Sequence, residues 1–323
     1  MLRVFSLGPA QAWIAPWAVA TLVLAPTTFA QAAKKKPAAP APAAPTATLD
    51  RIRSAGTVKL GYRIDARPFS YQGEAGKPAG FSVDLCQGLA ESLKTELSLP
   101  GLRVDWVPVT VENRFNLVQQ GQVDVLCGAE TVTLERRKQV AFSLPIFPGG
   151  VGVLTRTDAP ARLKDILSGK PQPFRPNYRG VALQVLREQT FAVVAGTTAE
   201  QWLSQRSGEL QVESKLARVG SYTAGVQAVA DREVSALFAD RAILLDAAKR
   251  NPAADKLTVI DRLFTYEPIA LAVPKGDDDF RLFVDKTLSK SYSATTFGTT
   301  YTKYFGEPDE SALTFYRWNA LPN

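Results

Sequence analysis

From about residue 49 onward, short apolar runs alternate with amphipathic stretches. Residues 58–62, VKLGY, alternate in the way that predicts a strand. The next stretch predicts a helix capped by Ser82. Its apolar side chains recur at helical spacing on one face: Cys86, Leu89, Ala90, Leu93 and Leu97. A second strand is expected around 104–106, followed by a short helix that Gly121 closes.

The following segments repeat this alternation. Residues 123–127, VDVLC, are almost entirely apolar and predict a parallel strand buried on both faces. Thr197 and Glu200 have the spacing of a capping box, so a helix should begin there after a strand at 191–195. Further elements are expected as helix 224–230, strand 235–239, helix 241–249, strand 269–273 and helices from 280. Strands that alternate with helices predict an α/β fold. Residues 159–190 contain chain-breaking prolines and glycines and predict an irregular excursion without an assigned role.

The first residues have a different character. Arg3 precedes an apolar stretch at 13–24 that Pro16 interrupts, and small residues surround Ala30 and Ala32. This pattern predicts a secretory signal peptide over residues 1–32, with cleavage near either alanine. A membrane anchor is the alternative, but the apolar run is short and broken for a spanning helix. Residues 33–48, rich in Lys, Pro and Ala, predict an extended linker.

Composition narrows the class of protein. Of the 323 residues, 46% are hydrophobic and 21% are charged, which suits a soluble globule with room for two lobes. The net charge is +7, but the basic residues beyond the linker are interleaved with acidic ones, so we expect no nucleic-acid partner. The sequence has no histidine, which excludes Ser-His-Asp catalysis and His-based metal sites. Cys86 and Cys127 could form one disulfide or remain buried thiols.

Charged and hydroxyl residues follow the predicted strands. Arg63, Arg114 and Arg136 follow the first three strands, and Asp240 ends a later one. In open α/β sheets, ligands bind outside the carboxyl ends of the strands. The carboxylate of an amino acid prefers a guanidinium and helix N-terminal amides, which Arg136 and the Thr197–Thr198 helix start could provide, and Asp240 could accept its ammonium group. Arg63 and Arg114 could hold an acidic side chain.

From about residue 49 to 322 the chain resembles the family 3 extracellular solute-binding proteins, and within them the glutamate/aspartate-binding branch. The most specific matching stretch is PVTVENRFNLVQQGQVDVLCGAETVTLERRKQVAFSLPIF, from Pro108 to Phe147. Other matching stretches are LDRIRSAGTVKLGYR, GFSVDLCQGLAESL, VVAGTTAE and SYTAGVQAVADREVSALFADRAIL. The resemblance implies a type II periplasmic-binding-protein fold of two α/β lobes joined by two crossing strands. Lobe 1 is expected at 49–153 plus 271–323, and lobe 2 at 154–270.

The resemblance also implies roles for individual residues. Arg136 matches the arginine that clamps the ligand α-carboxylate, Thr131 a nearby hydroxyl, and Thr198 the carboxylate-binding residue of lobe 2. Asp240 matches the acceptor of the α-ammonium group. The remaining matches are the side-chain arginines, an aromatic wall position and the branch's cysteines: Arg63, Arg114, Phe69, Cys86 and Cys127.

Four positions depart from the pattern of the branch. Ala129 and Glu130 stand where hydroxyl or small residues are usual, Val111 replaces a small polar residue, and Tyr222 stands where histidine can occur. The resemblance therefore implies that the grip on the backbone groups is kept and the side-chain pocket is altered. Glu130 could pair with an arginine or admit a more polar or cationic ligand.

These features predict the periplasmic binding component of an amino-acid ABC importer, which captures a polar, acidic, glutamate/aspartate-like ligand by hinge closure. Expected partners are the ligand and an inner-membrane permease; the protein should be monomeric, with no cofactor, metal or catalytic residue. The hinge is expected near residues 149–155 and 266–273. One alternative is an enzyme like cyclohexadienyl dehydratase, with Glu130 as an acid or base of raised pKa. Another is a ligand-sensing module.

Overall fold

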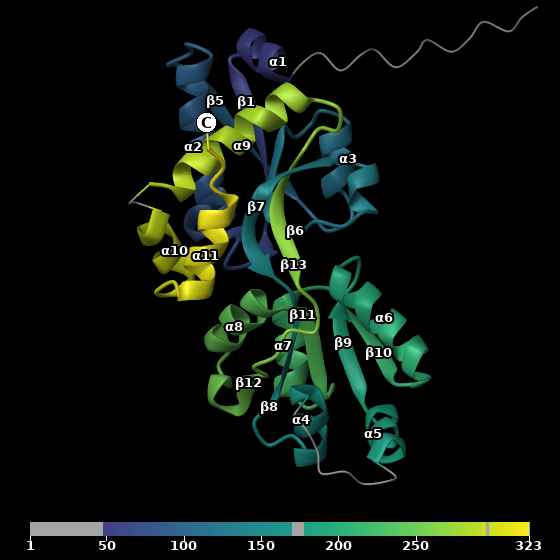
Figure 1. Cartoon of the computed structure of the whole chain (residues 1–323). Coiled ribbons are helices and arrows are strands. Elements are labelled where there is room, and N and C mark those ends of the chain that lie inside the picture. The colour runs from purple at the N-terminus through teal and green to yellow at the C-terminus, as the bar shows by residue number, and fades with distance from the viewer. Residues whose placement is uncertain (1–47, 170–177, 295–296, 323) are drawn as a thin grey trace, which may run out of the picture. The chain divides into compact units, whose positions relative to one another are not determined.

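The computed structural model describes residues 48–169, 178–294 and 297–322 (Figure 1). Two five-stranded mixed sheets dominate it, in the orders β5-β1-β6-β13-β7 and β10-β9-β11-β8-β12, and a small sheet has the order β2-β3-β4. The strands of the first sheet are β1 (Thr57–Arg63), β5 (Arg103–Val109), β6 (Val125–Thr131), β7 (Ala141–Gly149) and β13 (Glu267–Val273). Those of the second are β8 (Val151–Arg156), β9 (Thr190–Val194), β10 (Lys215–Val219), β11 (Ala236–Asp240) and β12 (Leu257–Val259). The small sheet consists of β2 (Asp65–Ala66), β3 (Ser70–Gln72) and β4 (Pro78–Ala79).

The helices cover both faces of each large sheet, as the apolar strands require. Those of the first half are α1 (Thr48–Ala55), α2 (Phe81–Glu96), α3 (Arg114–Gln119), α4 (Ala161–Ser168) and α5 (Tyr178–Arg187). Those of the second half are α6 (Thr198–Leu210), α7 (Tyr222–Ala230), α8 (Arg241–Arg250), α9 (Asp278–Tyr292), α10 (Phe297–Phe305) and α11 (Glu310–Asn319). Short 3₁₀ turns η1 (Glu74–Gly76), η2 (Arg136–Lys138) and η3 (Ala254–Lys256) complete the description. Within the described residues, no helix is long and apolar enough to cross a membrane.

In the first lobe, β1 lies parallel to both β5 and β6, so the carboxyl ends of these three strands meet at one edge of the sheet. β13 runs antiparallel to β6 and β7. Leu89 of α2 and Phe280 and Val284 of α9 belong to the core on one face. Val118 of α3 joins a separate cluster with Leu126 of β6 on the other.

The second lobe repeats the arrangement. β9 lies parallel to β10 and β11, whereas β8 pairs antiparallel with β11 and β12. Val226 of α7 and Leu244 of α8 pack on one side of this sheet. Leu163 of α4 and Leu203 of α6 pack with Phe238 on the other.

The chain passes between the two sheets twice. The first crossing joins β7 to β8 at Gly150, and the second lies between β12 and β13. The crossings touch, since the Val151 amide donates to the Thr265 hydroxyl at 2.9 Å and a Cβ at Gly150 would lie 2.2 Å from the Thr265 carbonyl oxygen. Only glycine therefore fits at Gly150. The lobe boundaries expected at 153/154 and 270/271 fall inside β8 and β13.

Three local expectations need correction. Ser82 does not cap α2; its hydroxyl instead donates to the Gly128 carbonyl at 2.8 Å, and the helix begins two residues earlier, at Phe81 after Gly80. The strand expected at 123–127 runs from Val125 to Thr131, because its pairing with β1 begins at Val125 and its pairing with β13 extends to Thr131. Within the irregular excursion expected at 159–190, helices α4 and α5 form. The expected signal peptide (1–32) and all but the last residue of the linker (33–48) lie outside the described residues.

Cys86 of α2 and Cys127 of β6 form the disulfide that the sequence left open. Both cysteines are fully buried where α2 packs on the first sheet. The bond links positions 41 residues apart, and closing a loop of that length restricts the unfolded chain.

We expect reduction of this disulfide to lower the free energy of unfolding by roughly 2 to 4 kcal/mol, the range for loops of this size. Urea unfolding with and without reductant measures the difference. The Cys86→Ser/Cys127→Ser double variant should show the lowered value in both conditions. Equal stability of the oxidised and reduced wild-type protein would contradict the expectation.

Candidate functional site

Three buried arginines meet at the carboxyl edge of the first sheet. Arg63 ends β1, Arg114 begins α3 after β5, and Arg136 begins η2 after β6. All three side chains are buried. Burying a guanidinium is unfavourable unless it is paired, so the partners of each arginine define what the site can still bind.

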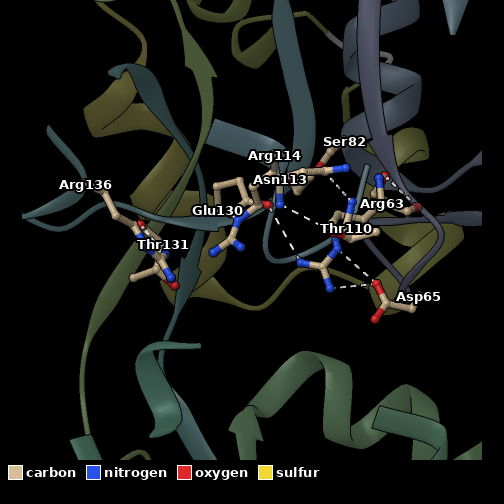
Figure 2. A network of polar contacts seen from close by, with 11 residues as sticks. Arg63, Asp65, Ser82, Thr110, Asn113, Arg114, Glu130, Thr131 and Arg136 are labelled. Atoms are coloured by element: carbon tan, nitrogen blue, oxygen red, sulfur yellow. Dashed lines mark hydrogen bonds and ion pairs between the residues drawn. The ribbon is translucent and has the colours of Figure 1, made fainter. Parts of the chain in front are cut away.

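Glu130 of β6 is the centre of this cluster (Figure 2). Its side chain is 1% exposed, and Arg114 Nε donates to its Oε2 at 2.6 Å. Arg63 Nη1 lies 3.9 Å from the other carboxylate oxygen, Oε1. Burial acts to raise the pKa of Glu130, but the charges of Arg114, Arg63 and Arg136 outweigh it and lower that pKa. The raised pKa on which the enzyme alternative depended is therefore wrong.

Arg63 has a second carboxylate partner. Its Nε and Nη2 donate to Asp65 Oδ1 at 3.0 and 2.6 Å. Burial acts to lower the pKa of Arg63, but Tyr222, Glu130 and Asp65 raise it overall. Arg63 and Arg114 thus each already form an ion pair with a carboxylate of the chain.

Arg136 differs from the other two. Its Nη1 donates to the Thr131 carbonyl oxygen at 2.8 Å, and its guanidinium lies 5.5 Å from the centre of the Phe115 ring. Among the described residues, no carboxylate oxygen comes within ion-pair distance of it. Burial lowers the pKa of Arg136, and Arg114 adds to this effect against the opposing charges of Glu130 and Glu267. Arg136 is therefore the guanidinium whose charge is still available to an anion.

The second lobe contributes the beginning of α6. The hydroxyl of Thr197 accepts the Glu200 amide at 3.3 Å and donates to the Val194 carbonyl at 2.7 Å, so it caps the helix as predicted. The Glu200 carboxylate accepts the Gly196 amide at 2.8 Å. In a standard capping box it would accept the amide of the cap residue, which is one position later. Thr198 is the first helical residue, and the free amides of this first turn favour an anion.

Asp240 ends β11 and caps α8. Its Oδ1 accepts the Ala242 and Ile243 amides at 2.9 and 3.4 Å, and its Oδ2 accepts the Gly150 amide at 3.1 Å. Burial raises the pKa of this carboxyl to about 6 in spite of these bonds, and Glu267 adds to the rise. Burial also raises the pKa of Tyr222, the first residue of α7.

These residues enclose a narrow cavity of about 30 Å³. Every proposed ligand-binding residue except Phe69 lines it: Arg63, Arg114, Ala129, Glu130, Thr131, Arg136, Thr197, Thr198, Tyr222 and Asp240. Phe69 packs instead against Phe147 and Phe305, with ring centres 5.0 and 5.4 Å away. Val111 stays outside the lining but lies at the boundary between the lobes, where a Cβ at Gly196 would come within 2.9 Å of its Cγ1.

Two groups of site residues were not identified from their sequence pattern. Ala199, Ala239 and Ile243 also line the cavity, but as small or apolar side chains they carry no distinctive signal. Asp65, the partner of Arg63, was also missed. Its position two residues beyond the strand-end arginine was the available signal.

Comparison with known proteins places the chain in a family. Residues 58–307 match the model of the bacterial extracellular solute-binding proteins, family 3, so the chain belongs to that family. It is 32% identical over 264 residues to the L-glutamate/L-aspartate-binding protein of Pseudomonas aeruginosa, covering 81% of each chain. It is 27% identical to the glutamate/aspartate import solute-binding protein of Escherichia coli K12, covering 90% of this chain and 88% of that one.

A solved structure agrees with this placement. The crystal structure of an ancestral amino-acid-binding protein, a precursor of cyclohexadienyl dehydratase, superposes with a TM-score of 0.64 at 27% identity. It covers 80% of this chain and 99% of that one. The predicted family and the predicted two-lobed α/β fold are thus confirmed.

The raised pKa of Asp240 predicts a pH dependence of stability. The folded state keeps this proton up to about pH 6, whereas an ordinary Asp loses it near 3.8. The free energy of unfolding should therefore fall as pH rises from about 4 to about 6, by about 3 kcal/mol from this group. Asp240→Asn, which can still cap α8, should remove that part of the fall.

Urea unfolding at several pH values tests this by the difference between wild type and Asp240→Asn. The control is Asp261→Asn, which changes a side chain that is 98% exposed. A difference between wild type and Asp240→Asn that stays constant from pH 4 to 7 would argue against a perturbed Asp240.

Proposed function

We propose that this protein is the periplasmic substrate-binding component of an amino-acid ABC importer and that it captures a polar α-amino acid. The observation that carries the proposal is the arrangement of Arg136 and Asp240 on the same cavity. One is a buried cation without a carboxylate partner among the described residues, and the other is a half-buried carboxylate. Together they complement a zwitterion, since its carboxylate and ammonium groups need opposite partners.

The ligand α-carboxylate would bind Arg136, with Thr131 and the first turn of α6 at Thr198 contributing hydroxyl and amide donors. The ammonium group would bind Asp240. Arg136 and Thr131 belong to the first lobe, and Thr198 and Asp240 to the second. A ligand held by both lobes favours their closure around the crossings at Gly150 and between β12 and β13.

The relatives named for glutamate and aspartate support an acidic ligand. They do not decide the class of the ligand side chain, however, because Arg63 and Arg114 on the cavity wall already pair with carboxylates of the chain. The partner would be an inner-membrane permease that accepts the closed, liganded form.

Catalysis is the second candidate function, because the ancestral relative is named as a precursor of cyclohexadienyl dehydratase. A dehydratase needs a group that can donate a proton near neutral pH. Glu130 has a lowered pKa and stays ionised there, so it is poorly suited to act as a general acid. This observation argues against Glu130 as the acid, and the Asp240 carboxyl, whose pKa is about 6, is assigned to the ligand ammonium group.

Arg136→Ala should weaken amino-acid binding by at least a hundredfold, because the desolvated ligand carboxylate loses its charge partner; such losses amount to roughly 2 to 5 kcal/mol. Isothermal calorimetry of the mature protein against the proteinogenic amino acids measures the effect. The matched control is Arg137→Ala, since this neighbouring arginine is exposed and should bind normally. If Arg136→Ala bound the same ligand as tightly as the wild type, the assignment of the carboxylate site would be wrong.

A further inference from the structure

We infer that Glu130 selects a ligand with a neutral side chain that donates a hydrogen bond, an amide or a hydroxyl, over one that carries a carboxylate. The inference rests on the proposed function, in which Arg136 and Asp240 hold the backbone groups. It names the class of side chain that fits the remaining part of the same cavity.

The charges at that end of the cavity already balance one another. Arg114 is paired with Glu130 at 2.6 Å, and Arg63 with Asp65 at 2.6 Å. No positive charge is left over there for an acidic side chain. A ligand carboxylate would have to displace Glu130 from Arg114 and leave two carboxylates side by side in a buried site, where like charges repel strongly.

Glu130 also has an unsatisfied hydrogen-bond acceptor. Glu130 Oε1 is buried and has no hydrogen-bond donor among the described residues, since Arg63 Nη1 is 3.9 Å away. Buried polar atoms without partners are rare in folded proteins, and an unmade bond to a buried acceptor is unfavourable. Glu130 is one of the residues that line the cavity, and the proposal requires a donor on the ligand to reach this oxygen.

The backbone at Gly128 leaves space for this carboxylate. A Cβ at Gly128 would lie 2.6 Å from Glu130 Oε1 and 3.3 Å from Arg63 Cγ. Any larger residue at Gly128 would push the carboxylate from its place. The absence of a side chain at Gly128 therefore leaves room for the Glu130 carboxylate beside the arginines. The position of Glu130 Oε1 depends on this glycine.

The same balance of charge disfavours a cationic side chain. Glu130 and Asp65 are already neutralised by Arg114 and Arg63, so no negative charge is left over for an added ammonium or guanidinium group. Neither an acidic nor a basic side chain therefore finds an unpaired counter-charge at this end of the cavity. A neutral donor needs none and completes the bonding of Oε1.

The test is calorimetric titration of the wild-type protein at pH 7.5 with L-glutamine, L-asparagine, L-serine, L-glutamate, L-aspartate, L-arginine and L-leucine. We expect one of the first three to bind at least tenfold more tightly than glutamate, aspartate, arginine or leucine. Tightest binding by any of these last four would overturn the inference and leave the proposed function standing. Absence of binding by every amino acid would instead remove the proposed function, and the inference with it.

A variant separates the role of Glu130 from that of the other wall residues. Glu130→Gln keeps the shape and removes the charge, and its amide can donate to a carboxylate. The ratio of glutamate to glutamine affinity should rise at least tenfold. The control Glu135→Gln changes an exposed carboxylate five residues along and should leave the ratio unchanged.

A thermal melt without ligand shows whether Glu130→Gln folds, and the wild-type ranking decides the question even if it does not. An unchanged affinity ratio in a folded Glu130→Gln variant would show that Glu130 does not select the side chain.

Discussion

Burial of three guanidinium groups around one carboxylate is the constraint on which this site depends. Such charges tolerate removal from water only when they neutralise one another or keep bound partners. The parallel pairing of β1 with β5 and β6 makes the cluster unavoidable, because it brings the ends of the three strands to a single edge. Glu130 then settles which positive charges remain free: it pairs with Arg114 and leaves Arg136 for a ligand.

The second lobe contributes backbone groups more than charged side chains. α6 and α8 both begin where parallel strands end, so their unpaired amides lie at the corresponding edge of the second sheet. The Thr197 hydroxyl already donates and accepts one hydrogen bond as the helix cap. In the proposed function, Thr198 and the first-turn amides are the groups that contact the ligand. Asp240 caps a helix as well, and desolvation raises the pKa of its carboxyl to about 6 although three amides donate to it.

The sequence predicted those features that follow from local pattern. Arg63 and Arg136 were assigned to strand ends from the alternation of apolar runs alone, and the cap at Thr197 from its spacing to Glu200. It failed where contacts across space decide. Serine is a favoured N-cap residue, yet the Ser82 hydroxyl donates to the Gly128 carbonyl of β6, 46 residues away in the sequence.

The predicted possibility that Glu130 pairs with an arginine is confirmed by its contact with Arg114, but the lowered pKa of Glu130 could not be predicted. Burial alone raises the pKa of a carboxyl, and a sequence does not reveal that three arginines from separate elements surround it. Phe69 shows the limit of transferring a role by position, because the aromatic side chain that resemblance assigns to a ligand wall is held by Phe147 and Phe305.

One residue connects the site to the passage between the lobes. Asp240 Oδ2 accepts the amide of Gly150, and a Cβ at Gly149 would lie 2.7 Å from that same oxygen. The carboxylate to which we assign the ligand ammonium group is therefore bonded to the first crossing segment. Any rotation about Gly149 and Gly150 must alter this hydrogen bond, and a cation at Asp240 must alter its strength. In the proposed function, ligand charge and lobe position thus act on the same oxygen atom, which would link closure directly to occupancy.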